Sequence, residues 1–271
     1  MKAIITTCVA VFMAVMSANA QSNYKEKTVF KNDDVEIRQI DEHTWHGNGH
    51  LVYNESIYLI EGEKSALLID AGTNIPGLKK IVEGIVHKPV TLVATHVHSD
   101  HTGTAINEWE SMWFNAADEV NIPKGYKFTV QKRYLTDGQV FDLGGRTIEV
   151  VFTPGHTPGS TTFIDREHHY GFSGDAFGSG NLLVFTDLST EIASCQRLAR
   201  FIDKYDIRYL YPGHYWGDNP ETPKRVKDVG AICCRILDGK LTPNAPSENA
   251  SLPYIVQKYG VKINYGEAQM R

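Results

Sequence analysis

The sequence is poor in cysteine. Four cysteines occur in 271 residues, and Cys8 lies in an N-terminal segment that we expect to be removed. The remaining Cys195, Cys233 and Cys234 are too few for a disulfide framework. Cys233 and Cys234 are chain neighbours, which rarely bridge each other without strain. We expect all three to be small apolar side chains of the interior, and a single bridge from Cys195 to one of the pair stays open.

The sequence also lacks a block of lysines and arginines. It has 27 basic and 32 acidic residues, which gives a net charge of -5. Binding to nucleic acid usually needs a clustered basic face, so nucleic acid is disfavoured as a partner. No linker, low-complexity tract or short-period repeat divides the chain, and residues 21–271 are therefore expected to form a single domain. Nothing in the sequence indicates an oligomeric state.

Long hydrophobic runs are missing except at the N-terminus. Lys2 precedes a mostly apolar run at 3–16, and Ala-Asn-Ala at 18–20 has the small-x-small spacing of a cleavage site. The run is too short to cross ~30 Å of hydrocarbon comfortably as a helix. We predict that residues 1–20 are a signal peptide. The mature chain would begin near Gln21, without a stable membrane anchor, in the periplasm or outside the cell.

The first half of the remaining sequence is typical of a β-α-β arrangement. Apolar runs at 57–60 and 66–69 flank a polar turn, which predicts a hairpin. Helical spacing follows at 78–86, and a strand is expected at 90–94. This strand delivers the chain to a histidine cluster that begins at Thr95. The carboxyl end of a strand is where open α/β sheets tend to carry their sites.

The second half repeats the pattern of paired strands followed by helices. Strand pairs are expected at 140–143 with 147–152, and at 161–164 with 170–173. A helix is predicted at 192–205, with Ser189 or Thr190 as its N-cap and Glu191 in its first turn. A strand at 208–211 and a final helix at 222–237 complete the prediction. Two strand-rich halves, each closed by helices, indicate two sheets packed together with helices outside.

The segment 95–101 reads Thr-His-Val-His-Ser-Asp-His, with three histidines and one carboxylate in seven residues. Imidazole and carboxylate groups suit Zn²⁺. Packing alone explains this cluster poorly, because each buried polar ring would need a partner of its own. We therefore expect His96, His98, Asp100 and His101 to be metal ligands.

Three later segments end in further candidate ligands. They read Thr-Pro-Gly-His, Ser-Gly-Asp-Ala and Tyr-Pro-Gly-His, and they contribute His156, Asp175 and His214. Their glycines let the backbone bend sharply, and the two prolines stiffen the turns before the histidines. Each segment alone is weak evidence. Their order after the first cluster is what makes the pattern specific.

The complete set resembles the metallo-β-lactamase superfamily, whose pattern is His-x-His-x-Asp-His, then His, then Asp, then His. The resemblance covers roughly residues 36–214, including the strand end at Asp70 and the segment 157–160. It implies an α/β (α+β) fold, a four-layered αββα sandwich with metals at one edge of its sheets. It also implies two Zn²⁺ per chain. One would be held by His96, His98 and His156, the second by Asp100, His101 and His214, and Asp175 would bridge them.

The chemistry implied is that of a zinc-dependent hydrolase acting on a small-molecule substrate. A hydroxide between two zinc ions would attack an ester, lactone, thioester or amide, and no Ser or Cys nucleophile would be needed. Asp100 is expected to orient that hydroxide in addition to binding metal.

The sequence departs in places from the motifs of individual branches of this superfamily, so several activities remain as alternatives. Hydrolysis of β-lactams is one, although Asp175 stands where true metallo-β-lactamases generally carry Cys or Ser, without a nearby Lys or Arg. The bridging Asp matches glyoxalase II-like thioester hydrolases and acyl-homoserine lactonases, but the lactonase tyrosine is replaced by Gly178. A mononuclear iron, persulfide dioxygenase-like oxidoreductase is another alternative, and it would leave the second ligand set unexplained. A metal-binding protein without catalysis is disfavoured by the intact ligand set.

Several residues outside the motif receive simpler interpretations. Tyr215 and the group Trp109, Trp113 and Phe114 are expected to pack in the interior, the latter as a helix face. The loop 177–185 follows Asp175 and is expected to form a wall of the substrate pocket. The remaining histidines are expected at the surface or in turns: His43, His46, His50, His87, His168 and His169.

Overall fold

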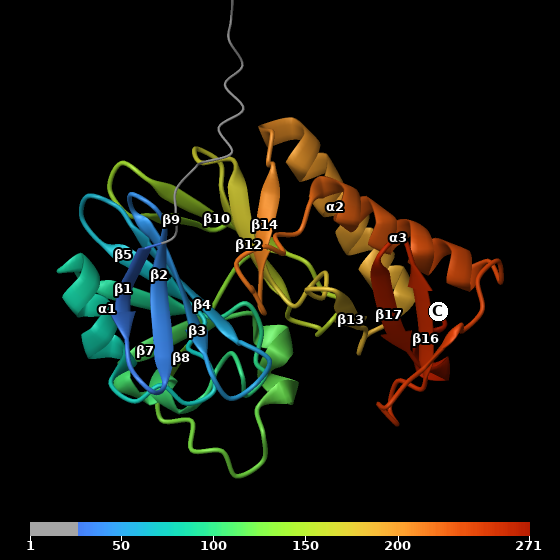
Figure 1. Cartoon of the computed structure of the whole chain (residues 1–271), viewed down its shortest axis with the longest axis horizontal. Coiled ribbons are helices and arrows are strands. Elements are labelled where there is room, and N and C mark those ends of the chain that lie inside the picture. Colours follow the sequence, from blue (N-terminus) through green and yellow to red (C-terminus); the bar gives the residue numbers. More distant parts are fainter. Residues whose placement is uncertain (1–26) are drawn as a thin grey trace, which may run out of the picture.

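The computed structural model describes residues 27–271, and the predicted signal peptide lies outside this part of the chain. Two large sheets lie next to each other, with helices on their outer sides (Figure 1). Among the described residues, no helix is both long enough and apolar enough to cross a membrane.

The first sheet has eight strands in chain order, antiparallel up to its fifth strand and parallel from there on. Its strands are β1 (Lys27–Lys31), β2 (Val35–Asp41), β3 (Thr44–Gly49), β4 (Ser56–Glu61), β5 (Ala66–Ile69), β6 (Val90–Val93), β7 (Ser111–Phe114) and β8 (Gln131–Tyr134). Helix α1 (Leu78–Val86) connects β5 to β6. Two 3₁₀ helices follow, η1 (Thr104–Glu108) and η2 (Ala116–Asn121).

The second sheet has five strands in the order β14-β12-β11-β10-β9, and only the β12–β14 pair is parallel. Its strands are β9 (Val140–Asp142), β10 (Thr147–Phe152), β11 (Thr161–Asp165), β12 (Tyr170–Gly174) and β14 (Tyr209–Pro212). Two long helices accompany it, α2 (Leu188–Tyr205) and α3 (Pro223–Leu237).

Three apolar clusters define four layers. Tyr58 and Ile69 of the first sheet pack with Phe163 and Phe172 of the second sheet. On the outer side of the first sheet, α1 buries the side chains at its i, i+4 and i+8 positions, which lie on one helix face. Helices α2 and α3 cover the outer side of the second sheet through a third cluster, which includes Leu198. The predicted αββα sandwich is confirmed.

The helix ends agree with the local sequence in most respects. Thr222 caps α3, since its hydroxyl accepts a hydrogen bond from the backbone N–H of Arg225, and Pro223 occupies the first helical turn. The prediction for α2 was wrong by a few residues. Its cap is Asp187, whose carboxylate accepts from the N–H of Thr190 at 2.7 Å, because a carboxylate beside a helix N-terminus also interacts well with the helix dipole.

A third, four-stranded sheet was not predicted. It has the order β13-β17-β16-β15 and consists of β13 (Asn181–Leu183), β15 (Ala245–Pro246), β16 (Tyr254–Lys258) and β17 (Val261–Tyr265). A short 3₁₀ helix, η3 (Glu267–Gln269), follows it. Apolar side chains of β16 and β17 join the cluster around α2 and α3, and Figure 1 shows these strands beside α3. The sheet therefore brings the C-terminal segment to the loop that follows Asp175.

Other outcomes concern single side chains. Trp109 and Phe114 are buried as expected, but they lie after η1 and on β7 rather than on one helix face. Cys195 and Cys233 are buried and free of disulfides, and Cys234 is a half-buried free thiol. His46 is fully buried on β3 against the ring of Tyr215, contrary to the expectation of a surface position.

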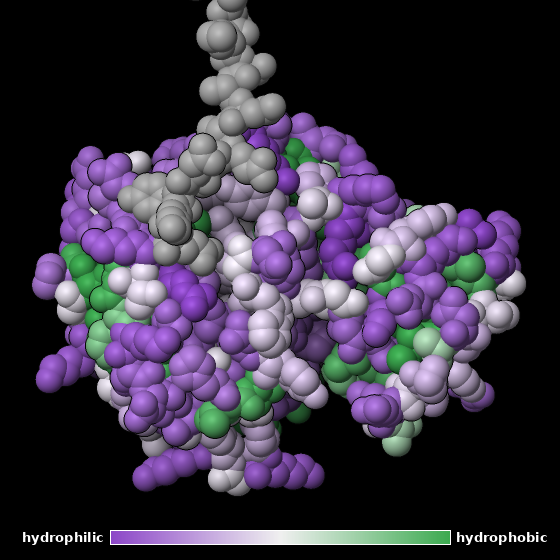
Figure 2. All heavy atoms as spheres, in the orientation of Figure 1, coloured by the Kyte–Doolittle hydropathy of each residue, from purple (hydrophilic) through white to green (hydrophobic). Residues whose placement is uncertain are grey.

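On the face that Figure 2 shows, hydrophilic residues predominate, and apolar ones gather in small separate areas.

Candidate metal centre

All the predicted ligands follow the ends of strands at one edge of the two large sheets. The loop after β6 carries His96, His98, Asp100 and His101. The turn between β10 and β11 carries His156. Strands β12 and β14 are parallel neighbours, so their carboxyl ends meet, and the N–H of Gly213 donates to the carbonyl of Gly174 at 2.7 Å. Asp175 directly follows Gly174 and His214 directly follows Gly213, so this contact brings the two ligand residues together.

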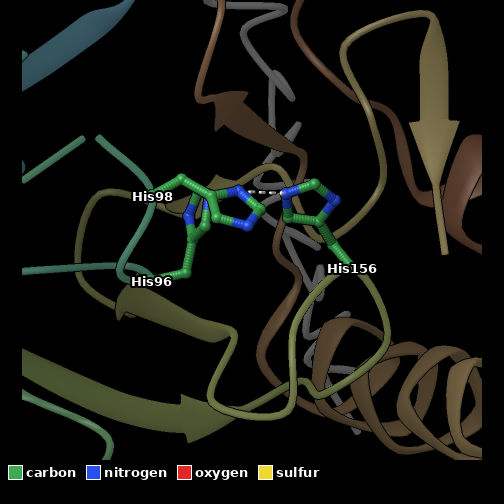
Figure 3. Close-up of side chains that lie close together, drawn as sticks. All are labelled: His96, His98 and His156. Carbon is green, nitrogen blue, oxygen red and sulfur yellow. Dashed lines mark hydrogen bonds between the residues drawn. The ribbon is translucent and has the colours of Figure 1, made fainter. Parts of the chain in front are cut away.

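Three histidines form the first group. Nε2 of His96 and Nε2 of His156 each lie 3.1 Å from Nδ1 of His98. Figure 3 shows the three rings converging, two from the loop after β6 and one from the facing turn. Nitrogens bound to one tetrahedral zinc at 2.0–2.1 Å lie about 3.3 Å apart. The spacing of these nitrogens therefore fits a single metal ion.

Asp100, His101 and His214 form the second group. Oδ2 of Asp100 lies 3.7 Å from Nε2 of His101 and 3.6 Å from Nε2 of His214. The ligand atoms of this group all lie within 4.8 Å of one another. A second metal ion would thus have two imidazoles and one carboxylate within reach.

Asp175 lies between the two groups. Its Oδ2 is 3.7 Å from Nε2 of His156 in the first group. The same oxygen is 3.7 Å from Nε2 of His101 and 3.4 Å from Nε2 of His214 in the second. The structure therefore brings together all seven of the residues that the sequence singled out.

The outer nitrogens of four histidines have partners of their own. Such bonds fix the tautomer and turn the other nitrogen toward a metal. Two of these contacts are to side chains: Nδ1 of His96 lies 3.1 Å from Oγ1 of Thr95, and Nδ1 of His101 lies 2.9 Å from Oδ2 of Asp70. The other two are to backbone carbonyls: Nδ1 of His156 lies 2.8 Å from that of Leu183, and Nδ1 of His214 lies 3.2 Å from that of Tyr53. The rings are therefore oriented before any ligand arrives.

Two buried atoms of the cluster lack a hydrogen bond within the described residues. They are Nε2 of His101 and Oδ1 of Asp175. Leaving a buried polar atom unpaired costs roughly 1–3 kcal/mol, and a cation between such groups would satisfy them. The donor set and these two atoms together fit divalent metal ions.

The protonation of the first group favours metal binding. Burial lowers the pKa of His96 and His156, and burial together with the charge of His156 lowers the pKa of His98 to about 4. The three imidazoles are therefore neutral near pH 7 and offer their lone pairs. In the second group, burial alone would lower the pKa of His101, but the charges of Asp100 and Asp175 outweigh it and raise the pKa.

A glycine lets the last strand pass close to the cluster. A Cβ added to Gly213 would meet Oδ1 of Asp175 and would lie 2.7 Å from Cε1 of His101. Any larger side chain would therefore displace two of the ligand residues. This explains the Pro-Gly-His sequence before His214 beyond its value as a turn.

Asp118 supports both ligand loops, although no sequence motif marks it. Its carboxylate accepts hydrogen bonds from the N–H of Val97 (2.8 Å), the N–H of Gly159 (2.6 Å) and the hydroxyl of Thr157 (3.0 Å). Val97 lies in the first ligand loop, and the other two follow His156. Asp118 therefore holds the first histidine group together without touching its nitrogens.

Glu221 supports the loop after Asp175 in the same way. Its carboxylate accepts from the hydroxyl of Ser173 at 2.7 Å and from the N–H of Ser179 at 3.0 Å. Ser179 Oγ in turn accepts from the N–H of His214 at 3.2 Å. Burial raises the pKa of Glu221 to about 7. Sequence reasoning also missed this residue, because its partners are distant along the chain.

A pocket of about 340 Å³ opens onto the candidate ligands His156, Asp175 and His214. The loop 177–185 lines one side of it, as expected from the sequence, and Tyr53 and Trp216 complete its lining. Tyr215 takes no part in this lining. It is buried among other aromatic rings, and its hydroxyl donates to the carbonyl of Gly217 at 2.8 Å, which confirms its predicted packing role.

Comparison with known proteins agrees with this arrangement. The chain matches the Metallo-beta-lactamase superfamily over residues 51–214. It is 28% identical over 200 residues to an acyl-coenzyme A thioesterase of Gallus gallus, an alignment that covers 59% of this chain and 72% of the relative. It is also 28% identical over 139 residues to a hydroxyacylglutathione hydrolase of Haemophilus influenzae, covering 45% and 66% of the two chains.

A solved structure supports the fold. The metallo-β-lactamase from Pontibacter korlensis superposes with a TM-score of 0.59 and 18% sequence identity, covering 74% of this chain and 99% of its own. At this identity the likeness concerns the sandwich and its layers.

Proposed function

The chain belongs to the metallo-β-lactamase superfamily of hydrolases, and we propose that it uses two zinc ions to hydrolyse a small ester or thioester. One observation carries the proposal. Oδ2 of Asp175 lies within 3.7 Å of ligand nitrogens from both histidine groups, which suits a carboxylate shared by two cations. Lactones and amides are the chemically neighbouring substrates.

We assign His96, His98 and His156 to the first ion and Asp100, His101 and His214 to the second, with Asp175 between them. Imidazole with a minority of carboxylate suits zinc. The completeness of the second group argues against the single-iron oxidoreductase considered from the sequence, because that reaction would leave Asp100, His101 and His214 without a role.

Bound zinc would lower the pKa of water and polarise the scissile carbonyl. The chain itself supplies orientation. Asp100, Asp175 and His214 are 15–18% exposed, whereas His101 is fully buried, so substrate approaches from the side of these three residues. Asp100, at the open edge of the second group, is the residue that we propose orients the attacking water as well as binding metal.

The site and the relatives together support an ester or thioester as the bond that is cleaved. Relatives named as an acyl-coenzyme A thioesterase and a hydroxyacylglutathione hydrolase both cleave thioesters. Hydrolysis of β-lactams is less well supported. Asp175 stands at the bridging position, and of the described residues no lysine or arginine lines the pocket to receive the carboxylate of such a drug.

The test combines metal content with turnover. The purified protein is analysed for metals and assayed against an aryl ester, an acyl thioester, a lactone and nitrocefin, before and after chelation and zinc replacement. We expect two zincs per chain, ester or thioester turnover that follows zinc, and little nitrocefin hydrolysis. One iron per chain would overturn the zinc assignment, and fast nitrocefin turnover would establish the β-lactam alternative.

The Asp175→Ala variant tests the bridging role separately. We expect it to lose most of the second metal and most activity, because the shared carboxylate would hold both ions. Two retained metals with normal turnover would refute this role.

A further inference from the structure

Three exposed aromatic side chains surround the candidate centre. Tyr53 is 82% exposed, Trp216 58% and Phe185 39%. Tyr53 and Trp216 line the pocket, and the ring of Phe185 lies 5.5 Å from that of His156 and 5.8 Å from that of His98. They come from three separate loops, after β3, β13 and β14. Exposed apolar groups that gather at one place commonly mark a binding surface.

The backbones of Tyr53 and Trp216 are held while their side chains face solvent. The carbonyl of Tyr53 accepts from Nδ1 of His214 at 3.2 Å. The N–H of Trp216 donates to Oδ1 of Asn219 at 2.6 Å, and Nδ2 of Asn219 donates to the carbonyl of His214 at 3.0 Å. Both aromatic residues are thus anchored to the same ligand turn, which fixes where their rings can meet a substrate.

The Tyr53 loop also has an unusual backbone. Tyr53 and Asn54 both have positive φ, 46° and 66°, a conformation that costs non-glycine residues free energy and is often kept at binding sites. Nδ2 of Asn54 donates to the carbonyl of Tyr215 at 3.1 Å, which ties the strained loop to the segment after His214. Packing in the interior does not explain the strain, because the side chain of Tyr53 is exposed.

The polar groups of the pocket are uncharged apart from the candidate metal ligands. No lysine or arginine belongs to its lining within residues 27–271. Ser179 and Asn181 supply the neutral polar groups. Oδ1 of Asn181 accepts from Nδ2 of Asn264 at 2.6 Å, so the amide N–H groups of Asn181 are left to donate to an oxygen of a ligand.

We propose, on the premise of the hydrolase function above, that the substrate is an ester or thioester whose uncharged apolar acyl group packs against Tyr53, Phe185 and Trp216. Its thiol or alcohol part is not recognised through charge. Coenzyme A and glutathione are both anionic near pH 7, and a pocket that recognised them by charge would need cations. Hydrolysis would join the oxygen of water to the acyl carbon, break the C–S or C–O bond, and release an acid together with a protonated thiol or alcohol.

Two thioesters that share the acyl group but differ in the charge of the thiol part test whether the pocket recognises that charge. Phenylacetyl-N-acetylcysteamine and phenylacetyl-coenzyme A share the acyl group and the end of the thiol, but only the second carries phosphates. We expect kcat/KM for the neutral thioester to equal or exceed that for the coenzyme A thioester. A tenfold or larger preference for the coenzyme A thioester would overturn the inference while leaving the hydrolase function intact.

Aromatic variants test the apolar contact. Trp216→Ala and Tyr53→Ala should each raise KM for the phenylacetyl thioester about tenfold, and should raise KM for the acetyl thioester by a clearly smaller factor. Tyr259→Ala is the control, since Tyr259 is 56% exposed but lies at the β16–β17 turn and outside the pocket lining. Equal effects on both acyl groups would overturn the inference. Failure of the parent protein to cleave any ester or thioester would instead refute the proposed function.

Discussion

Nδ2 of Asn264 lies 2.6 Å from Oδ1 of Asn181, and this contact joins the C-terminal strand β17 to the wall of the pocket. The same Nδ2 donates to the carbonyl of Leu182 at 3.1 Å. Asn264 is buried, whereas Asn181 is exposed toward the pocket. The third sheet, which no sequence motif predicted, therefore orients the side-chain amide of Asn181 beside the candidate metal centre.

Asn264→Ala should loosen Asn181 and leave the carbonyl of Leu182 without this donor. We expect KM for the ester or thioester to rise several-fold with unchanged zinc content, as measured by steady-state kinetics and elemental analysis. Asn244→Ala is a matched control, because Nδ2 of Asn244 also donates to a backbone carbonyl in the third sheet, that of Gln257, away from the pocket. Equal KM values for both variants would contradict a positioning role for Asn264.

Asp70→Asn should weaken the second metal site. Asp70 is buried, and its Oδ2 holds Nδ1 of His101 at 2.9 Å while also accepting from the hydroxyl of Thr95. An amide presents an N–H or a weaker acceptor to the ring, and loss of such a partner typically costs 10–100-fold in metal affinity. Zinc affinity is measured by competition with a chromophoric chelator. Asp33→Asn, at an exposed position, serves as the control, and equal affinities for the two variants would refute the prediction.

Asp118→Ala should destabilise the fold around both ligand loops. Two backbone N–H groups and the hydroxyl of Thr157 would lose their acceptor in a buried place, and such losses cost roughly 1–3 kcal/mol each. We expect the free energy of unfolding in urea to fall by roughly 3 kcal/mol or more. Glu119→Ala changes the neighbouring exposed carboxylate and should leave the unfolding midpoint nearly unchanged. A midpoint for Asp118→Ala that matches this control would show that the three donors find other acceptors.

Glu191 should make stability depend on pH. Burial raises its pKa to about 8 from an ordinary value of 4.5. The folded protein therefore keeps a proton that the unfolded chain releases between these values, and the contribution to stability is complete below about pH 4.5 and is lost as the pH rises toward 8. The slope from this group is at most about 1.4 kcal/mol per pH unit.

Glu191→Gln removes that dependence, since glutamine stays neutral. The free energies of unfolding of the parent and the variant are compared at pH 5, 7 and 9 under identical zinc conditions. The variant should gain stability relative to the parent as the pH rises. Parallel curves would show that Glu191 does not hold the proton.

Much of the fold could be read from local pattern. Helix α1 was predicted with its observed bounds, because Leu78, Val82 and Val86 recur at helical spacing on one face. The hairpin β4–β5 and the pair β11–β12 were predicted because each consists of two short apolar runs around a polar turn. The residues that form each of these patterns lie close together in the sequence, so the patterns can be recognised without tertiary contacts.

The candidate ligands were also local signals, since each lies in the loop or turn that follows a strand. Their roles as ligands and the zinc that they would hold remain predictions for the metal analysis. The identity and order of the donor groups are evident in the sequence alone, because coordination chemistry depends on imidazole and carboxylate side chains. Asp175 and His214 lie together because β12 and β14 pair in parallel.

The surroundings of those donors, in contrast, arise from contacts between segments that are far apart in the chain. Asp118 holds groups at 97, 157 and 159, Glu221 reaches back to Ser173 and Ser179, and β13 pairs with β17 about eighty residues later. Each of these contacts joins segments whose local sequences are unremarkable. The third sheet, the supports of the ligand loops and the aromatic pocket therefore depend on long-range pairing, whose partners no local periodicity specifies.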